Sequence, residues 1–466
     1  MNKQGNNRIS CALQQGSPPF AAISGGEGGG RAGARPGRGE LAPPENNRKR
    51  GARSVFLGCS AGAALCCIGL VLGCEDQTDP LPQTVIPIGA VESLTGDGMM
   101  AGTGLRAAIN LAVVEINKAG GVLGKTLMVV HQDDASDPAK GAANAPLLVQ
   151  RGVVGVIGGP DNGVYTALLA ATDASKMKKP LPILAAAATS PALAVSDNLF
   201  RTAPSDGAEA RALGAQAKAV MPALARVAVV YSDNAWGRGM AGGFSAALGS
   251  AAVARKVLVP AGAMSLADEA RMIVSDNPDG LALFTTADEA TKLLSEIPGK
   301  LPAMATPPRL LLSGRLHQQA FLDGLGAAKS LAEGALGVVR APDPMTTSAQ
   351  SAFVAAFQAA NMGADPPPYA DSAYDAVYVL AAAIQAAKST DGAQLVSGLP
   401  GVTSGDGATF GPGGWAQALA TLKAGGTVNY DGASGRLELD DAGDARGVYR
   451  TWSVMTGTLM DGAVLP

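Results

Sequence analysis

Two turns in this chain contain residue types that bind small anions. The first, residues 158–163 (GGPDNG), stands between a predicted strand and a predicted helix, and the second, residues 187–191 (AATSP), follows another predicted strand. Beyond the carboxyl ends of parallel strands, helix N-termini present free backbone N–H groups to which carboxylates bind. The chemistry that these turns predict is the binding of a small anion.

The motifs of common enzymes are missing or misplaced. Residues 102–107 (GTGLRA) fit the loose dinucleotide-binding pattern, but about ten residues separate them from Val91, and the pattern needs a tight turn directly after a strand. The chain has no P-loop and no Gly-x-Ser-x-Gly turn. Because its two histidines are His131 and His317, a histidine-rich metal site is excluded. We expect no catalysis, no metal and no cofactor; a dinucleotide-dependent enzyme is the enzymatic alternative.

Short apolar runs alternate with helical patterns from Val85 onward, which is typical of βα units in a parallel sheet. One helix places apolar residues on a single face from Leu105 to Ile116 and ends at Gly120-Gly121. The predicted strands of this first unit are 85–91, 126–130, 153–157 and 181–184, and its other helices are 139–150 and one that ends near 174. The strand at 126–130 is followed by Asp133-Asp134, for which solvated or capping roles are expected.

The same alternation restarts after residue 204. The predicted strands are 227–231, 256–259, 281–285, 310–312 and 335–339, and the predicted helices are 206–220, 240–248, 266–274 and 288–297. Further helices at 347–360, 370–387 and 414–424 cannot be assigned to either unit from periodicity. The predicted fold class is α/β, with two doubly wound, Rossmann-like lobes.

Length and charge are consistent with this division. Roughly 380 residues follow the N-terminal segment, too many for one ordinary core, so two lobes of ordinary size are expected. The formal net charge of −3 provides no basic field for nucleic acid. We expect no stretch after residue 75 to span a bilayer.

The N-terminal segment predicts export. A basic flank, residues 47–53 (NRKRGAR), precedes an uncharged run over residues 54–72, and all five cysteines lie at or before Cys74. Residues 71–74 (VLGC) resemble the lipobox of bacterial lipoproteins, which implies cleavage before Cys74 and acylation of that residue. An uncleaved transmembrane anchor is the alternative. Either interpretation places the rest of the chain outside the cytoplasm, without internal disulfides.

The predicted N-terminal organisation is a disordered extension with its basic flank at 1–53, a signal and lipobox segment at 54–74, and a polar linker at 75–84. The extension is rich in Gly, Pro, Ser, Asn and Arg and has no apolar periodicity. A start codon assigned too far upstream would also explain it, since signals begin near the initiator methionine.

An ordered series of short motifs resembles the periplasmic Leu/Ile/Val-binding proteins, which are substrate-binding components of branched-chain amino acid ABC transporters. The resemblance extends from Val85 to Trp452. Its motifs are residues 95–96 (TG), 117–124 (NKAGGVLG), 133–138 (DDASDP), 156–159 (VIGG), 187–191 (AATSP), 200–203 (FRTA), 231–237 (YSDNAWG), 374–377 (YDAV) and 435–443 (GRLELDDAG).

The resemblance implies the type I periplasmic-binding fold, in which a three-segment hinge joins two lobes that close around a ligand. We place the crossings near Pro204, Val339 and Gly435. Lobe I is then 85–204 plus 340–435, and lobe II is 205–339 plus 436–466. The implied function is capture of an amino acid or related small carboxylate by a monomer and its delivery to an ABC transporter permease. A ligand sensor that feeds a receptor or kinase is the alternative.

The same resemblance implies a ligand site. Asn162 and Thr189 would hold the ligand carboxylate through hydroxyl and backbone donors, with Gly163 also in the ligand site, and the carbonyl of Ala187 would accept from an ammonium. Local capping by Asn162 and Thr189 is the alternative interpretation. Trp236 occupies the position of an aromatic residue that closes over the ligand in the family, and packing is the alternative interpretation.

The resemblance also concerns Met99, Met100 and Arg315. Met99 and Met100 lie where the family presents an apolar wall, and core filling is the alternative for both. Arg315 departs from the family, because it falls where amino-acid binders place an acid against the α-ammonium. Either the ligand is not a simple neutral amino acid or the correspondence slips by a residue or two. The candidates for a substitute acid are Asp206, Asp233 and Asp288.

Overall fold

The computed structural model describes residues 81–159, 162–172, 180–194, 198–302 and 306–465. The predicted extension, signal segment and Cys74 lie outside the described residues, as does most of the predicted linker. All described residues belong to the unit formed by residues 75–466.

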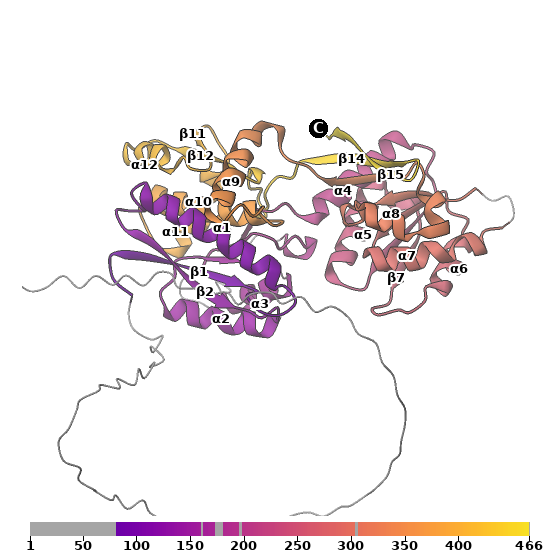
Figure 1. Ribbon diagram of the computed structural model, residues 1–466, viewed down its shortest axis with the longest axis horizontal. Helices are drawn as coiled ribbons and strands as arrows, with labels where there is room; N and C mark the ends of the chain where they lie inside the picture. The colour runs from indigo at the N-terminus through magenta and orange to yellow at the C-terminus, as the bar shows by residue number, and fades with distance from the viewer. Residues whose placement is uncertain (1–80, 160–161, 173–179, 195–197, 303–305, 466) are drawn as a thin grey trace, which may run out of the picture. The chain divides into compact units, whose positions relative to one another are not determined.

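The first sheet has five parallel strands in the order β2-β1-β3-β4-β5. The strands are β1 (Val85–Glu92), β2 (Thr126–Asp133), β3 (Val156–Gly158), β4 (Ile183–Ala185) and β5 (Leu199–Arg201). Along β1, Ile86, Ile88 and Ala90 join one core, whereas Val91 joins the core on the other face. This alternation follows from the two-residue period of a strand, so that helices cover both faces (Figure 1).

Helices α2 (Pro138–Gln150) and α3 (Asn162–Thr172) cover one face of the first sheet, and α1 (Met99–Lys118) and α10 (Ala370–Ala387) cover the other. By length and composition α1 could cross a membrane, contrary to our expectation for this part of the chain. Its apolar stripe, which includes Leu105 and Ile109, is buried against α10 and β1, as in the core helix of a globular domain.

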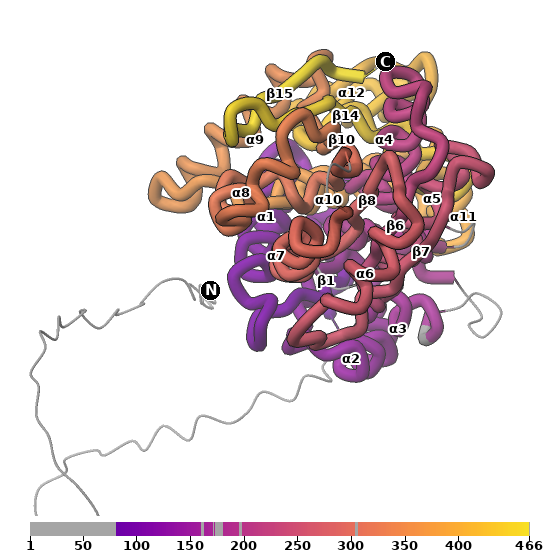
Figure 2. Tube along the Cα trace, turned by 90° about the vertical axis from the view of Figure 1, so that its right-hand side faces the viewer, coloured from indigo at the N-terminus to yellow at the C-terminus, as the bar shows by residue number. Residues whose placement is uncertain are grey.

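The second sheet has seven strands in the order β15-β14-β10-β9-β8-β6-β7. Figure 2 labels β15, β14, β10, β8, β6 and β7 of this sheet. The strands are β6 (Val227–Ser232), β7 (Val253–Val259), β8 (Gly280–Phe284), β9 (Arg309–Leu312), β10 (Leu336–Arg340), β14 (Tyr449–Met455) and β15 (Thr458–Val464). Strands β6 to β10 are parallel, whereas β14 and β15 form an antiparallel hairpin on β10. Helices α4 (Asp206–Val220) and α5 (Ala235–Leu248) pack on one face, and α6 (Ala267–Ser275), α7 (Ala287–Glu296) and α8 (Gln319–Gly324) pack on the other.

The helices that periodicity could not assign pack on the first sheet. Helices α9 (Thr347–Ala360), α11 (Gly392–Gly398) and α12 (Trp415–Lys423) surround α10, together with a small sheet of β11 (Ala408–Phe410), β12 (Val428–Gly432) and β13 (Gly435–Arg436). Nearly every residue of α10 is buried. On α10 the rings of Tyr374 and Tyr378 pack against each other. The ring of Tyr378 also stacks on that of Tyr430, with 5.4 Å between their centroids.

The predicted α/β class with parallel sheets is confirmed, but the predicted third crossing is wrong. We placed it near Gly435 and assigned 436–466 to lobe II. Instead, Leu437, Leu439 and Ala445 belong to the core of the first sheet, and the chain joins the second sheet only at Tyr449. The resemblance alone had located this crossing, because the segment has neither strand nor helix periodicity.

Arg201 ties the end of the first sheet to this late segment. Its guanidinium is fully buried and donates from Nε and Nη2 to the two carboxylate oxygens of Asp444, each at 2.5 Å. Nη1 donates to the carbonyl oxygens of Ser190 at 2.8 Å and Ala188 at 3.3 Å. Arg201 therefore fixes both carbonyls that flank Thr189.

Replacing Arg201 by glutamine should destabilise the protein by about 3–5 kcal/mol, because it leaves the Asp444 carboxylate without its partner. Urea unfolding followed by circular dichroism measures this change. The exposed Arg106→Gln on α1 is the control and should change stability by less than about 0.5 kcal/mol. A loss in Arg201→Gln as small as that in the control would contradict the role given to Arg201.

Candidate functional site

Asp206 is the acid around which the candidate site is built. It is the first residue of α4, whose N-terminus is capped by Ser205, the side chain of which accepts from the Gly207 N–H. The Oδ2 of Asp206 accepts a hydrogen bond from the Thr189 hydroxyl at 2.7 Å, and its backbone N–H donates to the Thr189 carbonyl at 2.8 Å. A turn after the first sheet is thus joined to a helix that packs on the second.

Trp236 and Arg315 stack on each other. Trp236 lies in the first turn of α5, which Asn234 caps by accepting from the Gly237 N–H at 2.8 Å. The indole is 5% exposed, and the guanidinium carbon of the exposed Arg315 lies 4.0 Å from its ring centroid. This is a cation–π contact. Two residues that were predicted separately therefore form one surface.

Glu209 brings a second acid to the same place. It lies one turn after Asp206 on α4 and accepts from the Gly314 N–H at 2.7 Å, which holds the loop that carries Arg315. Burial, with a smaller contribution from the nearby Asp206 carboxylate, raises the pKa of Glu209 to about 8, although the Gly314 hydrogen bond and the Arg315 charge act to lower it. At neutral pH this carboxyl group is therefore mostly protonated.

More groups stabilise the charged form of Asp206 than that of Glu209. Burial raises its pKa, while the Thr189 hydrogen bond, the Arg315 charge and the Trp236 indole all act to lower it. Tyr369, which precedes α10, lies in the same field: burial and Asp206 raise the pKa of its phenol, and Arg340 opposes this. Tyr369 adopts a left-handed backbone with φ of 68°, uncommon for a residue with a side chain.

Sequence reasoning missed Glu209 and Tyr369. Glu209 had a signal, because residues three apart on a helix share a face and Asp206 was already a candidate. Tyr369 had none that periodicity could provide, since it follows the prolines 366–368 and lies outside the helix that it precedes.

The two predicted anion-binding turns lie at one edge of the first sheet. They follow β3 and β4, which pair with Gly158 beside Ala185. Asn162 is the first residue of α3, with Gly163 next to it, but the Asn162 side chain is outside what the structure describes. Ala187 is 6% exposed and packs in the core. The ligand contacts of Asn162, Gly163, Ala187 and Thr189 stay predictions.

The other predicted residues have different surroundings. Asp233 pairs with Arg238, and the exposed Asp288 pairs with Lys292 at 2.7 Å, which leaves Asp206 as the substitute acid in the cluster. Met99 and Met100 are 48% and 85% exposed, so their alternative role as core filling is wrong.

Asp133 and Asp134, at the end of β2, hold a turn together. Asp133 accepts from the N–H groups of Leu94, Thr95 and Ala135, whereas Asp134 is fully buried and accepts from the Ser93 hydroxyl at 2.7 Å. Neither acid caps a helix, because Asp137 is the N-cap of α2, so the expected capping role is wrong, and the solvated alternative is wrong for Asp134.

The glycines of the dinucleotide-like motif have a packing explanation. Gly102 and Gly104 both lie inside α1, and an added Cβ would stand 2.1 Å from the Ser93 carbonyl oxygen and 2.1 Å from a Pro367 ring carbon, respectively. Neither glycine forms the strand-to-helix turn that the fingerprint requires. Among the described residues, no cluster of three or more His, Cys, Asp or Glu side chains could hold a metal ion.

The pH dependence of stability tests the environment of Glu209. Because its folded pKa lies above the ordinary value of 4.5, rising pH ionises this group in the unfolded chain first and so favours unfolding. Between about pH 4.5 and 8, Glu209→Gln, which keeps an acceptor for Gly314, should gain stability relative to the wild type. Urea unfolding at several pH values checks this, with Glu269→Gln on α6 as control. Parallel stability profiles for wild type and Glu209→Gln would contradict the assignment.

Comparison with known proteins agrees with this architecture. The family model described as periplasmic binding protein matches residues 85–432. The chemotactic signal transduction system substrate-binding protein BasB of Halobacterium salinarum is 25% identical over 364 residues, covering 77% of this chain and 84% of that protein. The Leu/Ile/Val-binding protein homolog 3 of Brucella melitensis is 27% identical over 325 residues, covering 67% and 82%.

Solved structures share the fold. The leucine-binding protein LivK of Thermotoga maritima has a TM-score of 0.59 at 19% identity, covering 82% of this chain and 98% of that one. A solute-binding protein of an ABC transporter from R. palustris, solved in complex with benzoate, has a TM-score of 0.56 at 19% identity, covering 82% and 96%. With a family model that spans most of the chain, this protein belongs to the periplasmic binding protein family.

Proposed function

We propose that this protein captures an amino acid or a related small carboxylate outside the cytoplasm and delivers it, as a lipid-anchored monomer, to an ABC transporter permease. The observation that carries the proposal is the cluster of Thr189, Asp206, Trp236 and Arg315, in which a turn of the first sheet meets two helices and a loop of the second. An acid, a hydroxyl, an aromatic ring and a guanidinium are suited to orient a small charged molecule.

The residues of the proposed site would bind different groups of the ligand. Asp206 supplies the acid that an α-ammonium requires, and it replaces the acid expected at the position of Arg315. The turn at residues 158–163, before α3, is suited to the ligand carboxylate, because helix N-termini attract anions. The exposed guanidinium of Arg315 is then available to a further acidic or polar group of the ligand.

The comparisons support two ligand classes. LivK is named a leucine-binding protein, and the R. palustris protein was solved with benzoate, an acid without an ammonium. Asp206 favours an amino acid and Arg315 favours a carboxylate. We therefore propose both ligand classes, and the affinities of site variants distinguish amino acids from acids without an ammonium.

A sensor is the second candidate function. The relative in Halobacterium salinarum is named for chemotactic signal transduction, so a fold of this kind also serves a receptor. Transport requires that the loaded protein stimulate ATP hydrolysis by a reconstituted permease and ATPase. Stimulation of a receptor or kinase instead would favour the sensor.

A thermal-shift panel of amino acids, amides, dicarboxylates and aromatic acids tests ligand capture. A ligand at 100 times its Kd should stabilise the protein by about 2.7 kcal/mol, which gives a clear rise in Tm. Asp206→Asn should weaken binding of a ligand with an ammonium at least tenfold, because a charged hydrogen bond is lost, at about 1.5–3 kcal/mol. Arg315→Met should weaken acids without an ammonium by a similar factor.

Asp233→Asn is the matched control, because Asp233, which precedes α5, pairs with Arg238 of that helix and its loss should not change affinity. If no member of the panel raises Tm, or if Asp206→Asn and Asp233→Asn bind every ligand equally, the proposed site is wrong.

The lipid anchor is tested at Cys74. Cys74→Ser removes the thiol that would be acylated, so the protein should move from the membrane fraction to the soluble extracytoplasmic fraction. Fractionation with mass measurement of the wild-type N-terminus checks both steps. A wild-type chain that carries no acyl group and keeps the residues before Cys74 would instead favour the uncleaved anchor.

A further inference from the structure

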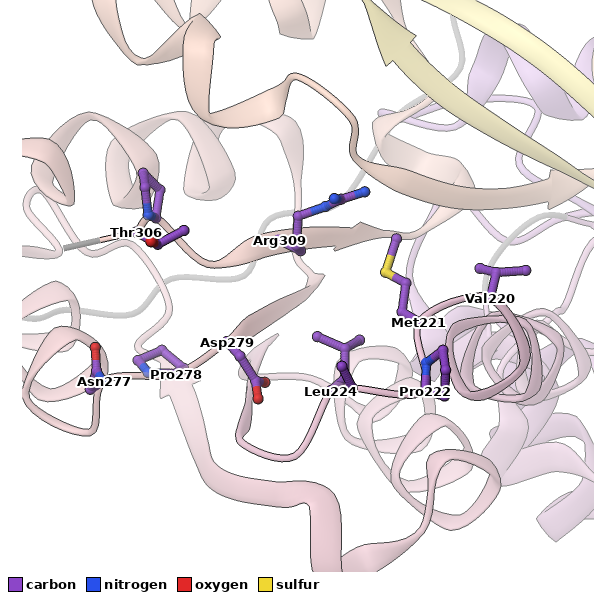
Figure 3. A pocket seen from close by; sticks show the side chains of 11 residues that line it. Val220, Met221, Pro222, Leu224, Asn277, Pro278, Asp279, Thr306 and Arg309 are labelled. Atoms are coloured by element: carbon purple, nitrogen blue, oxygen red, sulfur yellow. The ribbon is translucent and has the colours of Figure 1, made fainter.

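A large cavity lies on the second sheet, apart from the cluster around Asp206. Its volume is about 930 Å³, and three segments line it: residues 220–224 at the end of α4 and beyond, residues 277–279 before β8, and residues 306, 307 and 309 at the start of β9 (Figure 3). This volume is typical of pockets that enclose small organic molecules.

The cavity and the candidate site occupy opposite edges of the sheet. Its lining segments lead into the amino ends of β6, β8 and β9, which are neighbouring parallel strands. Trp236 and Arg315 instead follow the carboxyl ends of β6 and β9. A molecule in the cavity is therefore not the ligand held by Asp206.

Hydrogen bonds hold the three segments together. The Asp279 carboxylate accepts from the N–H groups of Ala225 at 2.8 Å and Arg226 at 3.0 Å. The Asp279 N–H donates to the Arg226 carbonyl at 3.1 Å, and the Arg309 N–H donates to the Asp279 carbonyl at 2.9 Å. The cavity is thus preformed, and the Asp279 carboxylate already accepts the hydrogen bonds that hold its lining segments together.

The wall of the cavity is mainly apolar. Val220, which is 53% exposed, ends α4, and Met221, Leu224, Pro278 and Pro307 continue the surface. Figure 3 shows the Met221 and Leu224 side chains beside each other along one wall. Apolar side chains exposed in a concave surface favour an apolar ligand, and the thioether of Met221 can adapt to its shape.

Among the described residues that line the cavity, Arg309 is the one cation. The exposed Arg309 donates from Nη2 to the Gly334 carbonyl at 2.9 Å, and Gly334, with φ of 69°, has no side chain to obstruct it. Arg309 forms no ion pair with any acid of the described residues, so its other guanidinium donors are available. A guanidinium of this kind matches the two oxygens of a carboxylate.

We propose that this cavity is a second binding site, for an apolar monocarboxylate whose chain lies on Val220, Met221 and Leu224 and whose carboxylate binds Arg309. An amino acid fits it poorly, because the only acid in the lining, Asp279, already accepts from two backbone N–H groups and leaves an ammonium without a partner. A lipid-like or aromatic acid has the required single charge and apolar body.

Methyl NMR of the purified protein labelled at methionine, titrated with decanoate, tests the site. Met221 should shift, whereas Met99 and Met100, at the start of α1, should not. Arg309→Gln should weaken decanoate binding at least tenfold, since a charged hydrogen bond is lost, and it should leave binding of the uncharged decanol unchanged. Arg271→Gln, at an exposed arginine of α6 outside the lining, should bind decanoate like the wild type.

A cavity-filling variant provides the second measurement. Met221→Trp should exclude both decanoate and decanol, and its far-ultraviolet circular dichroism reports whether it folds. If Met221 does not shift up to millimolar decanoate, if Met99 and Met100 shift in its place, or if Arg309→Gln binds decanoate as tightly as Arg271→Gln, the proposal is overturned.

Discussion

The buried guanidinium of Arg201 is the interaction on which the candidate site depends. Burying an arginine costs several kcal/mol unless a carboxylate and further acceptors compensate it. Here Asp444 takes two of its nitrogens, and the carbonyls of Ala188 and Ser190 take a third. The compensating groups come from two separate parts of the chain, so the charge of Arg201 can be buried only when both are assembled around it. The geometry around Thr189 is thereby set by the core.

Helix α4 extends that order to the second sheet. It starts at Asp206 directly after the chain leaves the first sheet, and its first turn carries both acids of the site. Asp206 faces the turn that Arg201 holds, and Glu209 faces the loop that carries Arg315. Two acids this close in a partly buried place repel each other. Protonation of one of them, Glu209, relieves that repulsion while Arg315 offsets the other.

Much of the fold could be predicted from the sequence, because periodicity reports which face of an element is buried. The helices at 206–220, 347–360 and 370–387 were predicted with the bounds that the structure has. The hairpin of β14 and β15 was missed because β15 is largely exposed and has no apolar alternation. The strand β5 was missed because only two of its three residues are apolar, whereas β3 and β4, which are equally short, lie within longer apolar runs.

The site could be predicted only in its parts. Thr189, Trp236 and Arg315 were singled out individually, but periodicity contains no information on which loops meet across two sheets. The stacking of Arg315 on Trp236 and the bond from Thr189 to Asp206 depend on the lengths of the connections and on the Arg201 anchor. The contacts that these residues make with a ligand stay predictions.

Because of the hydrogen bond from Thr189, a ligand at the proposed site would share the Asp206 carboxylate with the protein. Oδ2 of Asp206 already accepts from this hydroxyl, which is held in place, and a carboxylate can accept further hydrogen bonds. A neutral amide brings a hydrogen bond of similar strength and gains little, whereas a full positive charge gains more from the carboxylate. The proposed site would therefore favour a ligand that carries a positive charge over a neutral ligand of the same size and shape.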